Sequence, residues 1–431
     1  MKKLKYPWWV TLLAIVGGLA LVTALVTLFI STGRRPSVLH VTDVPPVDSP
    51  DFLLSVAGAA GAPIEAGGTA QLLNNGVEIF PAMLEAIRGA QQTINFAVYI
   101  WEPGQVSDQM FAALTERARA GVQVRLLLDG IGGLKAPGEG IKALRAAGGK
   151  VEPFRPPRFG KFTRFHKRNH RRAIVIDGDT AFTGGAAVGD KWLGNADSEE
   201  HWRDTMVRLT GPPAVPIQSA FVPLWAPVAG ELLSGPGFFP PLPPTPGTAM
   251  RSVGVSSSPS SEDHPLRLFF VQSFLSARHK LYIATPYFVP DEMLRKAVIN
   301  RARAGVDVRI LLPDEHTDAK PIRRTSHHYY AELLAAGVRI YEYQPTMMHS
   351  KVVVVDGKWS VVGSANMDIR SYELNQENVL GILDTAFARQ VEAAFQRDLA
   401  QSTRIDPVRW AKRGLWDRFM ERMSALFEEQ Y

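Results

Sequence analysis

Cysteine is absent from this 431-residue sequence, which therefore has neither disulfide bonds nor thiolate metal sites. The same absence leaves the redox compartment undetermined. A large excess of one charge is also missing, since the formal net charge is only +6. This modest positive balance favours anionic partners but does not distinguish nucleic acid from lipid. With 46% hydrophobic and 21% charged residues, the chain is globular and long enough for two domain cores.

Charged residues are missing from one early stretch, WWVTLLAIVGGLALVTALVTLFI, which runs from Trp8 to Ile30 and is long enough to cross a bilayer as a helix. A cleaved secretory signal is the alternative, but the apolar core is too long and no small-x-small cleavage site closes it. We therefore expect a single-pass transmembrane helix over residues 7–31 and localisation to the cell membrane. Basic residues flank both ends of the stretch, so the side of the membrane that holds the rest of the chain stays open.

Two segments rich in proline, glycine and small residues divide the remaining sequence. The first, residues 32–67, is expected to be a linker, and so is the second, residues 229–248, which contains SGPGFFPPLPPTPG. They delimit a first domain over residues 68–228 and a second over residues 249–402. An amphipathic C-terminal helix is expected over residues 403–431.

The two domains carry matching strings in the same order. ERARAGVQVRLLLD at residues 116–129 matches NRARAGVDVRILLPD at residues 300–314, and LRAAGGKVEPFRP from Leu144 parallels LLAAGVRIYEYQP from Leu333. Each string predicts a helix end, a turn glycine and a buried strand. Because strands alternate with helices in both parts, we expect a duplicated α/β domain in which each copy has a largely parallel sheet.

A second repeated pattern carries the chemistry. The fragments NHRRAIVIDGDTAFTGG and MHSKVVVVDGKWSVVGSAN each set a histidine two residues before a basic side chain, then continue as an apolar strand into Asp-Gly. The Asp-Gly pair predicts a hairpin turn. Residues two apart in a strand face the same side, so His170 should lie beside Arg172 and His349 beside Lys351.

The strand that returns from each hairpin brings further groups back toward the histidine. Glycines allow close approach there, and in the second copy a serine and an asparagine offer hydrogen-bond donors. A pocket of imidazole, cation, hydroxyl and amide suits a tetrahedral anion such as phosphate. The candidate substrate-binding residues are Gly184, Gly185, Gly363, Ser364 and Asn366.

Acidic residues complete each set. Asp204 lies 34 residues past the first histidine and Glu377 lies 28 residues past the second, so each could hold the second ring nitrogen of its own histidine. Asp177 and Asp356 fall at the hairpin turns, away from the histidines, and are expected to be structural. No carboxylate cluster with metal-ligand spacing accompanies the histidines, so neither a metal nor another cofactor is expected.

These motifs resemble the phospholipase D superfamily, whose signature is His-x-Lys, four residues, Asp, then Gly-Ser or Gly-Gly and often Asn. The second copy fits fully, and TPYFVPDEML and GSANMDIRSYELNQE around it are similar to the bacterial cardiolipin synthase branch. The first copy departs from the signature, with Arg172 at the lysine position and with Gly185 and Ala187 in place of Ser and Asn. Arginine keeps the charge, but its planar fork is not equivalent to an ammonium group.

The resemblance implies two pseudo-symmetric phospholipase D-type α/β domains with the active site between them. It also implies cofactor-free phosphatidyl transfer through a phosphohistidine, which joins two phosphatidylglycerol molecules into cardiolipin and releases glycerol. By this analogy His170 is the nucleophile, His349 is the general acid and base, and the two cations stabilise the phosphate oxygens. The pseudo-symmetry leaves the order of the histidines open, and the oligomeric state is equally undetermined.

Two other functions stay open. One is a phosphodiesterase that uses the same site to hydrolyse phospholipid or nucleic acid, and the other is a catalytically weak lipid-binding protein, which the departures in the first motif would suit. The segment from Arg155 to Arg172 holds eight Lys or Arg, no acid and three interleaved phenylalanines. It could be a solvated loop, a nucleic-acid strip or a clamp for anionic headgroups, and the expected anchor favours lipid over nucleic acid.

The last residues combine apolar and basic side chains. Leu415, Trp416, Phe419, Met420, Met423 and Phe427 recur at helical spacing, with five arginines or lysines along the same stretch. Two interpretations stay open: a helix that lies on a bilayer surface, and a terminal helix that packs on the preceding domain.

Overall fold

The computed structural model describes residues 7–30, 41, 43–157, 167–241, 249–259, 264–426 and 428. Helix α1 (Trp8–Ile30) belongs to one unit, Met1–Val41, and all other elements belong to a second unit, Thr42–Tyr431. The side chains of α1 are described over residues 8–23 and are mostly exposed. Within the described part of the chain, no helix combines the length and apolar content that crossing a membrane requires, so the expected transmembrane helix is not supported.

The first half of the second unit is built on a seven-stranded sheet in the order β2-β8-β7-β6-β3-β4-β5. Its strands are β2 (Thr69–Asn74), β3 (Thr93–Val98), β4 (Gln123–Asp129), β5 (Lys150–Phe154), β6 (Ala173–Ile176), β7 (Thr180–Gly184) and β8 (Thr205–Thr210). Strands β3, β4 and β5 pair in parallel, whereas the pairings that involve β2, β6, β7 and β8 are antiparallel. The expectation of a largely parallel sheet was therefore wrong, because the tight turn between β6 and β7 can only reverse the chain.

Helices cover both faces of this sheet. One side carries α3 (Asn75–Gly89), α4 (Gln105–Arg119) and α5 (Gly138–Ala146), and the other carries α6 (Val215–Ala229). The alternation of side chains along a strand explains how β3 serves both layers. Ile94, Phe96 and Val98 face the core under α3 and α4, while Ala97 faces the opposite layer.

The second half repeats this plan in a nine-stranded sheet, β1-β9-β17-β15-β14-β10-β12-β13-β18. Its strands are β1 (Ile64–Ala66), β9 (Arg251–Ser257), β10 (Lys280–Ala284), β12 (Asp307–Pro313), β13 (Arg339–Tyr343), β14 (Val352–Val355), β15 (Trp359–Gly363), β17 (Glu377–Leu383) and β18 (Ser402–Arg404). Its helices are α7 (Pro265–Leu275), α8 (Glu292–Arg303), α9 (Lys320–Ala335), α10 (Ile369–Glu373) and α11 (Thr385–Ala400), and β11 (Phe288–Val289) pairs with β16 (Met367–Asp368). Without the edge strands β1 and β18, the order matches the first sheet strand for strand, so the predicted duplication is confirmed.

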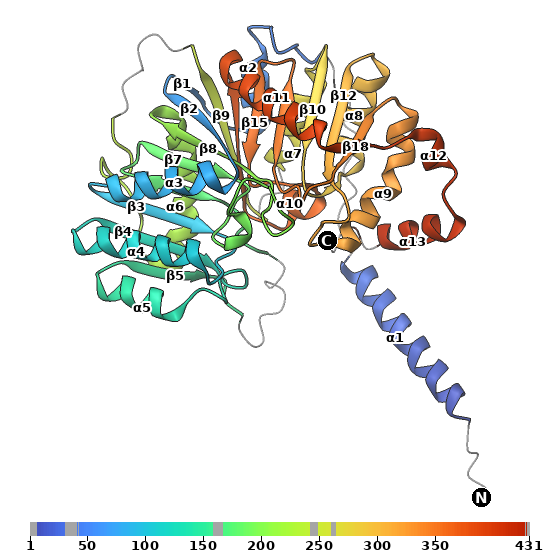
Figure 1. The fold of residues 1–431 in the computed structure, drawn as a ribbon, viewed down its shortest axis with the longest axis horizontal. Coiled ribbons are helices and arrows are strands. Elements are labelled where there is room, and N and C mark those ends of the chain that lie inside the picture. Colours follow the sequence, from blue (N-terminus) through green and yellow to red (C-terminus); the bar gives the residue numbers. More distant parts are fainter. Residues whose placement is uncertain are drawn as a thin grey trace, which may run out of the picture. The chain divides into compact units, whose positions relative to one another are not determined.

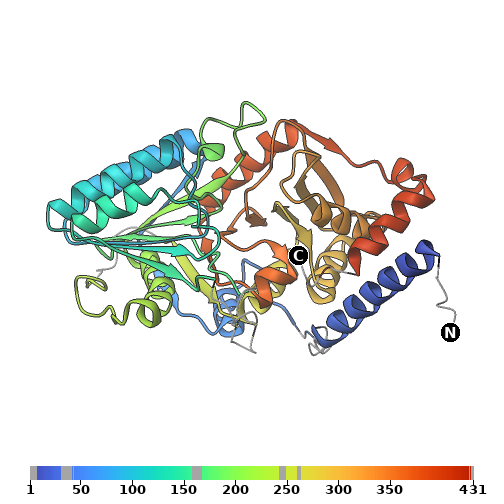
Figure 2. The ribbon, with the colours of Figure 1, turned by 90° about the horizontal axis from the view of Figure 1, so that it is seen from below.

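The two sheets share one interior. Leu127 and Val175 of the first sheet belong to the same buried cluster as Leu311, Val354 and Leu380 of the second. Helix α6 contacts both β6 and β9, and α11 contacts both β14 and β2, so each of these helices packs on both halves. Figures 1 and 2 show the blue-to-green first half beside the yellow-to-red second half. The halves therefore form one compact unit instead of two separable domains.

Two segments differ from their expected form. The expected linker over residues 32–67 contains α2 (Phe52–Ala60) and β1, which pack on the second half. The ring of Phe52 meets Trp359 edge to face at 5.2 Å between centroids, and β1 pairs with β9.

The expected single C-terminal helix is instead two, α12 (Pro407–Ala411) and α13 (Leu415–Ala425), because the chain turns at Gly414. Residues 242–248 of the second expected linker lie outside the described residues.

The two hairpin aspartates tie each motif to its sheet, as predicted. Asp177 and Asp356 adopt positive φ angles of 52° and 50° at the turns. Each carboxylate accepts three backbone N–H bonds from the residues that lead into the neighbouring antiparallel strand, which are Gln91, Gln92 and Thr93 before and at the start of β3 and Arg278, His279 and Lys280 before and at the start of β10. These contacts hold each hairpin against β3 or β10, away from the histidines.

Candidate active site

Each histidine lies just before a hairpin strand and is placed by a short backbone bridge to the opposite half. The His170 amide donates to the Gln376 carbonyl at 3.0 Å, and the Gln376 amide donates to the Arg168 carbonyl at 2.8 Å. In the second motif the His349 amide donates to the Arg203 carbonyl at 2.7 Å, and the Arg203 amide donates back at 2.9 Å to the residue two before His349. The two bridges are parallel, so the motif of each half is held beside the acidic segment of the other.

The bridges produce two crossed histidine–carboxylate pairs. His170 Nδ1 lies 2.7 Å from Glu377 Oε1 and 3.0 Å from Oε2, while His349 Nδ1 lies 2.6 Å from Asp204 Oδ2. We expected each histidine to use the carboxylate of its own half, and this was wrong. Both carboxylates are the predicted ones, but each crosses to the other half. Because Nδ1 of each ring faces a carboxylate, Nε2 is the ring nitrogen that can react with a substrate.

Each carboxylate is itself held by neighbouring donors. Asp204 accepts from the Trp192 indole at 2.9 Å and from the Thr205 amide at 2.7 Å. Glu377 accepts from the hydroxyl of Ser364 and, at 3.2 Å, from the side-chain amide of Asn375. The two halves thus use different donors for the same purpose, which is to fix the carboxylate that orients an imidazole.

The basic side chains of the two motifs occupy equivalent places. Lys351 Nζ donates to the His349 carbonyl at 2.7 Å and lies 3.2 and 3.3 Å from the two ring nitrogens of that histidine. Arg172 donates from one terminal nitrogen to the His170 carbonyl at 2.6 Å and is 1% exposed. Its buried Nε has no partner among the described residues. The exchange of lysine for arginine therefore keeps a cation beside the first histidine.

Burial and neighbouring cations keep both imidazoles neutral. Burial lowers the pKa of His170 well below its usual value, and Arg172 and Lys351 add to this shift. Burial and Lys351 also lower the pKa of His349, to about 4, although Asp204 opposes the shift. Burial alone would raise the pKa of Asp204, but His349 and its hydrogen bond bring it below its usual value. Asp204 is therefore the ionised partner of His349.

The second buried carboxyl and the lysine titrate near neutrality. Burial raises the pKa of Glu377 to about 7, against the lowering effect of Ser364 and Arg172. Burial also lowers the pKa of Lys351 to about 7, against the raising effect of Asp204. Arg172 stays charged throughout the physiological range, even though burial lowers its pKa as well. The site can therefore bind an anion with one permanent and one pH-dependent cation.

The glycines predicted to bind substrate have a packing role in the structure. A Cβ at Gly185 would lie 2.1 Å from Asp204 Oδ1, and one at Gly363 would lie 2.5 Å from the Asn378 carbonyl. Gly184 is similarly close to β8 and has a φ of 153°. These glycines let the return strand approach its neighbour, and their contact with substrate stays a prediction.

The other two predicted substrate-binding residues differ from each other. Ser364 is engaged with Glu377, and its hydroxyl also accepts from the Asn378 amide at 3.0 Å. Asn366 is 5% exposed, and its buried side-chain oxygen has no partner among the described residues. Asn366 therefore keeps an unused acceptor, whereas Ser364 acts through the carboxyl group that it holds.

Part of the predicted basic segment is interior. Arg168 forms an ion pair with Asp129 at 3.0 Å, and both side chains are buried. Arg171 donates to the carbonyls of Ser257 at 2.7 Å and Glu377 at 3.1 Å, so it links the first motif to the second half. Neither the solvated-loop nor the headgroup-clamp interpretation applies to these arginines. Residues 158–166, which include the three phenylalanines, lie outside the described residues.

Aromatic rings surround both histidines. Tyr99 meets His170 edge to face at 5.2 Å between centroids, and Trp192 and Trp202 lie 5.7 and 5.2 Å from His349. The two tryptophans were not among the residues predicted for the site. The string HWRD, which sets Trp202 two residues before Asp204, was the available signal.

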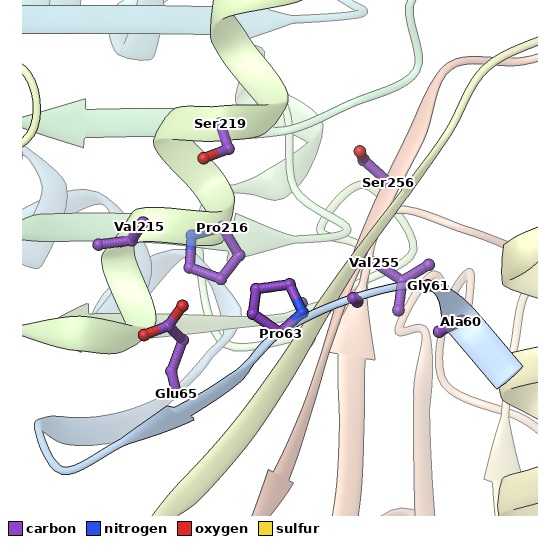
Figure 3. A pocket seen from close by; sticks show the side chains of 11 residues that line it. Ala60, Gly61, Pro63, Glu65, Val215, Pro216, Ser219, Val255 and Ser256 are labelled. Atoms are coloured by element: carbon purple, nitrogen blue, oxygen red, sulfur yellow. The ribbon is translucent and has the colours of Figure 1, made fainter. Parts of the chain in front are cut away.

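A cavity of about 220 Å³ lies elsewhere, between β1, the start of α6 and β9 (Figure 3). Glu65, Ser219 and Ser256 are among the residues that line it, and burial raises the pKa of Glu65. None of the predicted site residues, all of which the structure describes, lines this cavity. Across the described residues, no group of three or more His, Asp or Glu side chains could share a metal ion.

Comparison with known proteins decides the family. The family described as "Cardiolipin synthase, PLD-like domain" matches the chain twice, at residues 83–212 and 270–399. The chain belongs to this cardiolipin synthase branch of the phospholipase D superfamily. The resemblance inferred from the motifs is confirmed, as is the expectation of a phosphatidyltransferase enzyme.

Individual relatives agree with this assignment. The chain is 34% identical over 370 residues to "Probable cardiolipin synthase YwiE" of Bacillus subtilis, covering 86% of this chain and 73% of that protein. It is 38% identical over 340 residues to "Cardiolipin synthase A" of Pseudomonas fluorescens, covering 78% and 70%. The crystal structure of a phosphatidylserine synthase from Haemophilus influenzae has the same fold, with a TM-score of 0.67, 16% identity and coverage of 88% and 97%.

The crossed pairing predicts which side chains depend on each other for stability. Alanine substitutions of His170 with Glu377, and of His349 with Asp204, should be non-additive by about 0.5–3 kcal/mol in the free energy of unfolding, because each pair is in direct contact. The same-half combinations, His170 with Asp204 and His349 with Glu377, should show much smaller coupling. Four double-mutant cycles by denaturant unfolding measure this, and stronger coupling within each half would contradict the crossed arrangement.

The pKa of Lys351 predicts an alkaline limit to activity. Since this pKa is lowered to about 7, the free enzyme loses the charge as the pH rises through that value, and kcat/KM should fall. Lys351→Arg should move the fall to higher pH, because arginine keeps its charge. Arg172→Lys is the matched variant in the first motif, and it should make the fall of kcat/KM with rising pH steeper. Profiles of kcat/KM across the neutral and alkaline range test this, and an unchanged alkaline limb in Lys351→Arg would exclude Lys351 as its source.

Proposed function

We propose that this enzyme joins two phosphatidylglycerol molecules into cardiolipin and releases glycerol, through a covalent phosphohistidine. One observation carries the proposal: two buried histidines each face a carboxylate supplied by the other half and have a cation beside them. This arrangement offers a nucleophile, a proton donor and charge for a phosphate in one place. The relatives named as cardiolipin synthases support the choice of lipid.

The reaction proceeds in two displacements at phosphorus. The first displacement needs a protonated His349, and the negative charge of the bound phosphate raises the pKa of this imidazole so that it takes up a proton on binding. His170 Nε2 then forms a bond to the phosphorus of one phosphatidylglycerol, the bond from phosphorus to the glycerol oxygen breaks, and His349 donates its proton to that oxygen. In the second, His349 takes the proton from a hydroxyl of another phosphatidylglycerol. That oxygen then attacks the phosphohistidine, forms cardiolipin and frees His170.

The surroundings of the two rings support this division of roles. Asp204 is ionised and opposes the fall in the pKa of His349, so its negative charge stabilises the imidazolium that an acid must form. Burial and neighbouring cations lower the pKa of His170, and burial raises the pKa of its partner Glu377, so this partner opposes the fall less than Asp204 does for His349. A neutral imidazole with a free Nε2 is the form that attacks phosphorus. The environments thus favour His170 as nucleophile and His349 as acid and base.

The cations serve the phosphate oxygens. Lys351 and Arg172 each lie against the carbonyl of their own histidine, so both can reach an anion held between the rings. The phosphoryl group gains negative charge on its oxygens during each displacement, and fixed cations in a buried site stabilise that charge strongly. We propose that Arg172 performs in the first motif the role that Lys351 performs in the second.

We also propose that residues 7–31 hold the enzyme at the cell membrane. The stretch from Trp8 to Ile30 contains no charged residue and is helical. A chain without residues 1–31 should therefore leave the membrane fraction after an alkaline wash, which removes peripheral proteins, while the full chain stays. Release of the full chain by the same wash would contradict the anchor.

Product analysis tests the proposed reaction. Purified full-length protein is incubated with labelled phosphatidylglycerol in mixed micelles, and the lipids are separated. Cardiolipin and glycerol should appear in equal amounts, and His170→Ala and His349→Ala should each lower the rate by about 10³-fold or more, because each removes an essential group. Phosphatidic acid as the sole product would indicate a hydrolase. Lipid binding without turnover would indicate the catalytically weak lipid-binding protein.

An activated substrate separates the roles of the two histidines within the same experiment. A p-nitrophenyl ester of phosphatidic acid has a leaving group that needs no proton. His349→Ala should therefore release a burst of p-nitrophenolate equal to the enzyme present, whereas His170→Ala should release none. The reverse pattern would make His349 the nucleophile. His201→Ala, at a histidine whose ring nitrogen contacts Asp197 instead of a predicted site residue, is the matched control.

A further inference from the structure

Helix α13 leaves its apolar side chains in solvent. Leu415 is 84% exposed, Trp416 70%, Phe419 51% and Leu426 67%, and Met423 is exposed as well. Because a helix turns once every 3.6 residues, these five side chains form one stripe about 100° wide. Trp416 and Phe419 stack on each other, with 5.6 Å between centroids. The stripe is therefore a continuous apolar ridge.

The opposite side of α13 is the one that packs on the protein, and it has little apolar surface: Met420, Ser424 and Ala425 are half-buried beside one buried residue. α13 contacts α9, and its buried residue is Glu421, which is 7% exposed and forms an ion pair with Arg413. A terminal helix that merely covered the domain would turn its apolar side inward. The orientation of α13 is the reverse, so its apolar ridge faces outward and does not contribute to the core.

Basic side chains flank the ridge. Arg418 and Arg422 lie on α13 beside the stripe at helical spacing, and both are exposed. Arg409 and Lys412, at α12 and the turn after it, are exposed too. Asp417 and Glu421 lie on the other side of the helix. This separation of charge places cations where they can meet an anionic surface while the ridge is buried in it.

We propose that α13 lies in the surface of an anionic phospholipid bilayer, with Leu415, Trp416, Phe419, Met423 and Leu426 inserted among the acyl chains and Arg418 and Arg422 against the headgroups. The choice of a lipid surface rests in part on the proposed function, whose substrate is an anionic lipid. A second copy of the chain fits less well. An 11-residue helix is about 16 Å long, which is short for the roughly 800 Å² that each partner buries in a stable protein interface.

The lack of cysteine in the chain allows a local probe. Trp416→Cys and, as a matched control on the opposite side of the same helix, Asp417→Cys are labelled with an environment-sensitive fluorophore in the full-length protein. With vesicles that contain phosphatidylglycerol, the label at 416 should shift to the blue and be quenched by lipids carrying a shallow acyl-chain quencher. The label at 417 should change little, and vesicles of phosphatidylcholine alone should give a much smaller shift at 416. Equal responses at 416 and 417, or no response at either, would overturn the proposal.

A shift at 416 that grows with protein concentration in the absence of vesicles would overturn the proposal in favour of a second copy of the chain as the occupant.

Activity gives a second readout, which separates this proposal from the proposed function. Trp416→Glu combined with Phe419→Glu should lower turnover of phosphatidylglycerol in vesicles by about tenfold or more, while the rate in detergent micelles stays within about twofold, since micelles deliver lipid without a bilayer surface. Equal rates on vesicles for the variant and the parent would contradict a role for α13. Absence of turnover in the parent chain would count against the proposed function alone, because the label at 416 reports insertion without any reaction.

Discussion

Two hydrogen-bonded pairs that cross between the halves, His170 with Glu377 and His349 with Asp204, are the contacts on which the site depends. A buried carboxylate without a partner is costly, and removing one member of a buried pair leaves the other uncompensated. Neither half can form a complete pair by itself, because each supplies a histidine to one pair and a carboxylate to the other. The duplicated fold therefore makes a single candidate active site.

The surrounding structure holds these pairs in register. The backbone bridges next to each histidine, the interior shared by the two sheets, and the helices α6 and α11 that pack on both halves all oppose relative movement of the halves. Arg171 and Arg203 add to this by donating to groups beside the bridges, and Arg203 is also paired with Asp398 at 2.9 Å. A site held in this way is preorganised for the charge that would develop on a phosphate in the proposed reaction.

The duplication is symmetric in fold and unequal in chemistry. Gly185 and Ser364 occupy equivalent positions in the two halves. Gly185 makes room for Asp204, whereas Ser364 donates a hydrogen bond to Glu377. Burial raises the pKa of Glu377, against the lowering effect of Ser364, whereas His349 brings the pKa of Asp204 below its usual value. Two related histidines thereby acquire different environments, and such divergence is how one fold separates a nucleophile from an acid and base.

The sequence by itself determined the features that follow from local pattern: the duplication, the two hairpins, the structural aspartates, the histidines and the cation beside each. The hairpins, aspartates, histidines and cations are recognisable within windows of a few residues, where strand periodicity and turn chemistry operate, and the duplication is recognisable from matching strings in the two halves. Only the tertiary structure decided which carboxylate serves which histidine, that α2 packs on the second half, and that α13 turns its apolar side outward. The partners of the histidines lie 207 and 145 residues away in the chain, and a contact across such a distance leaves no local signature. It is decided by how two halves with a shared core meet.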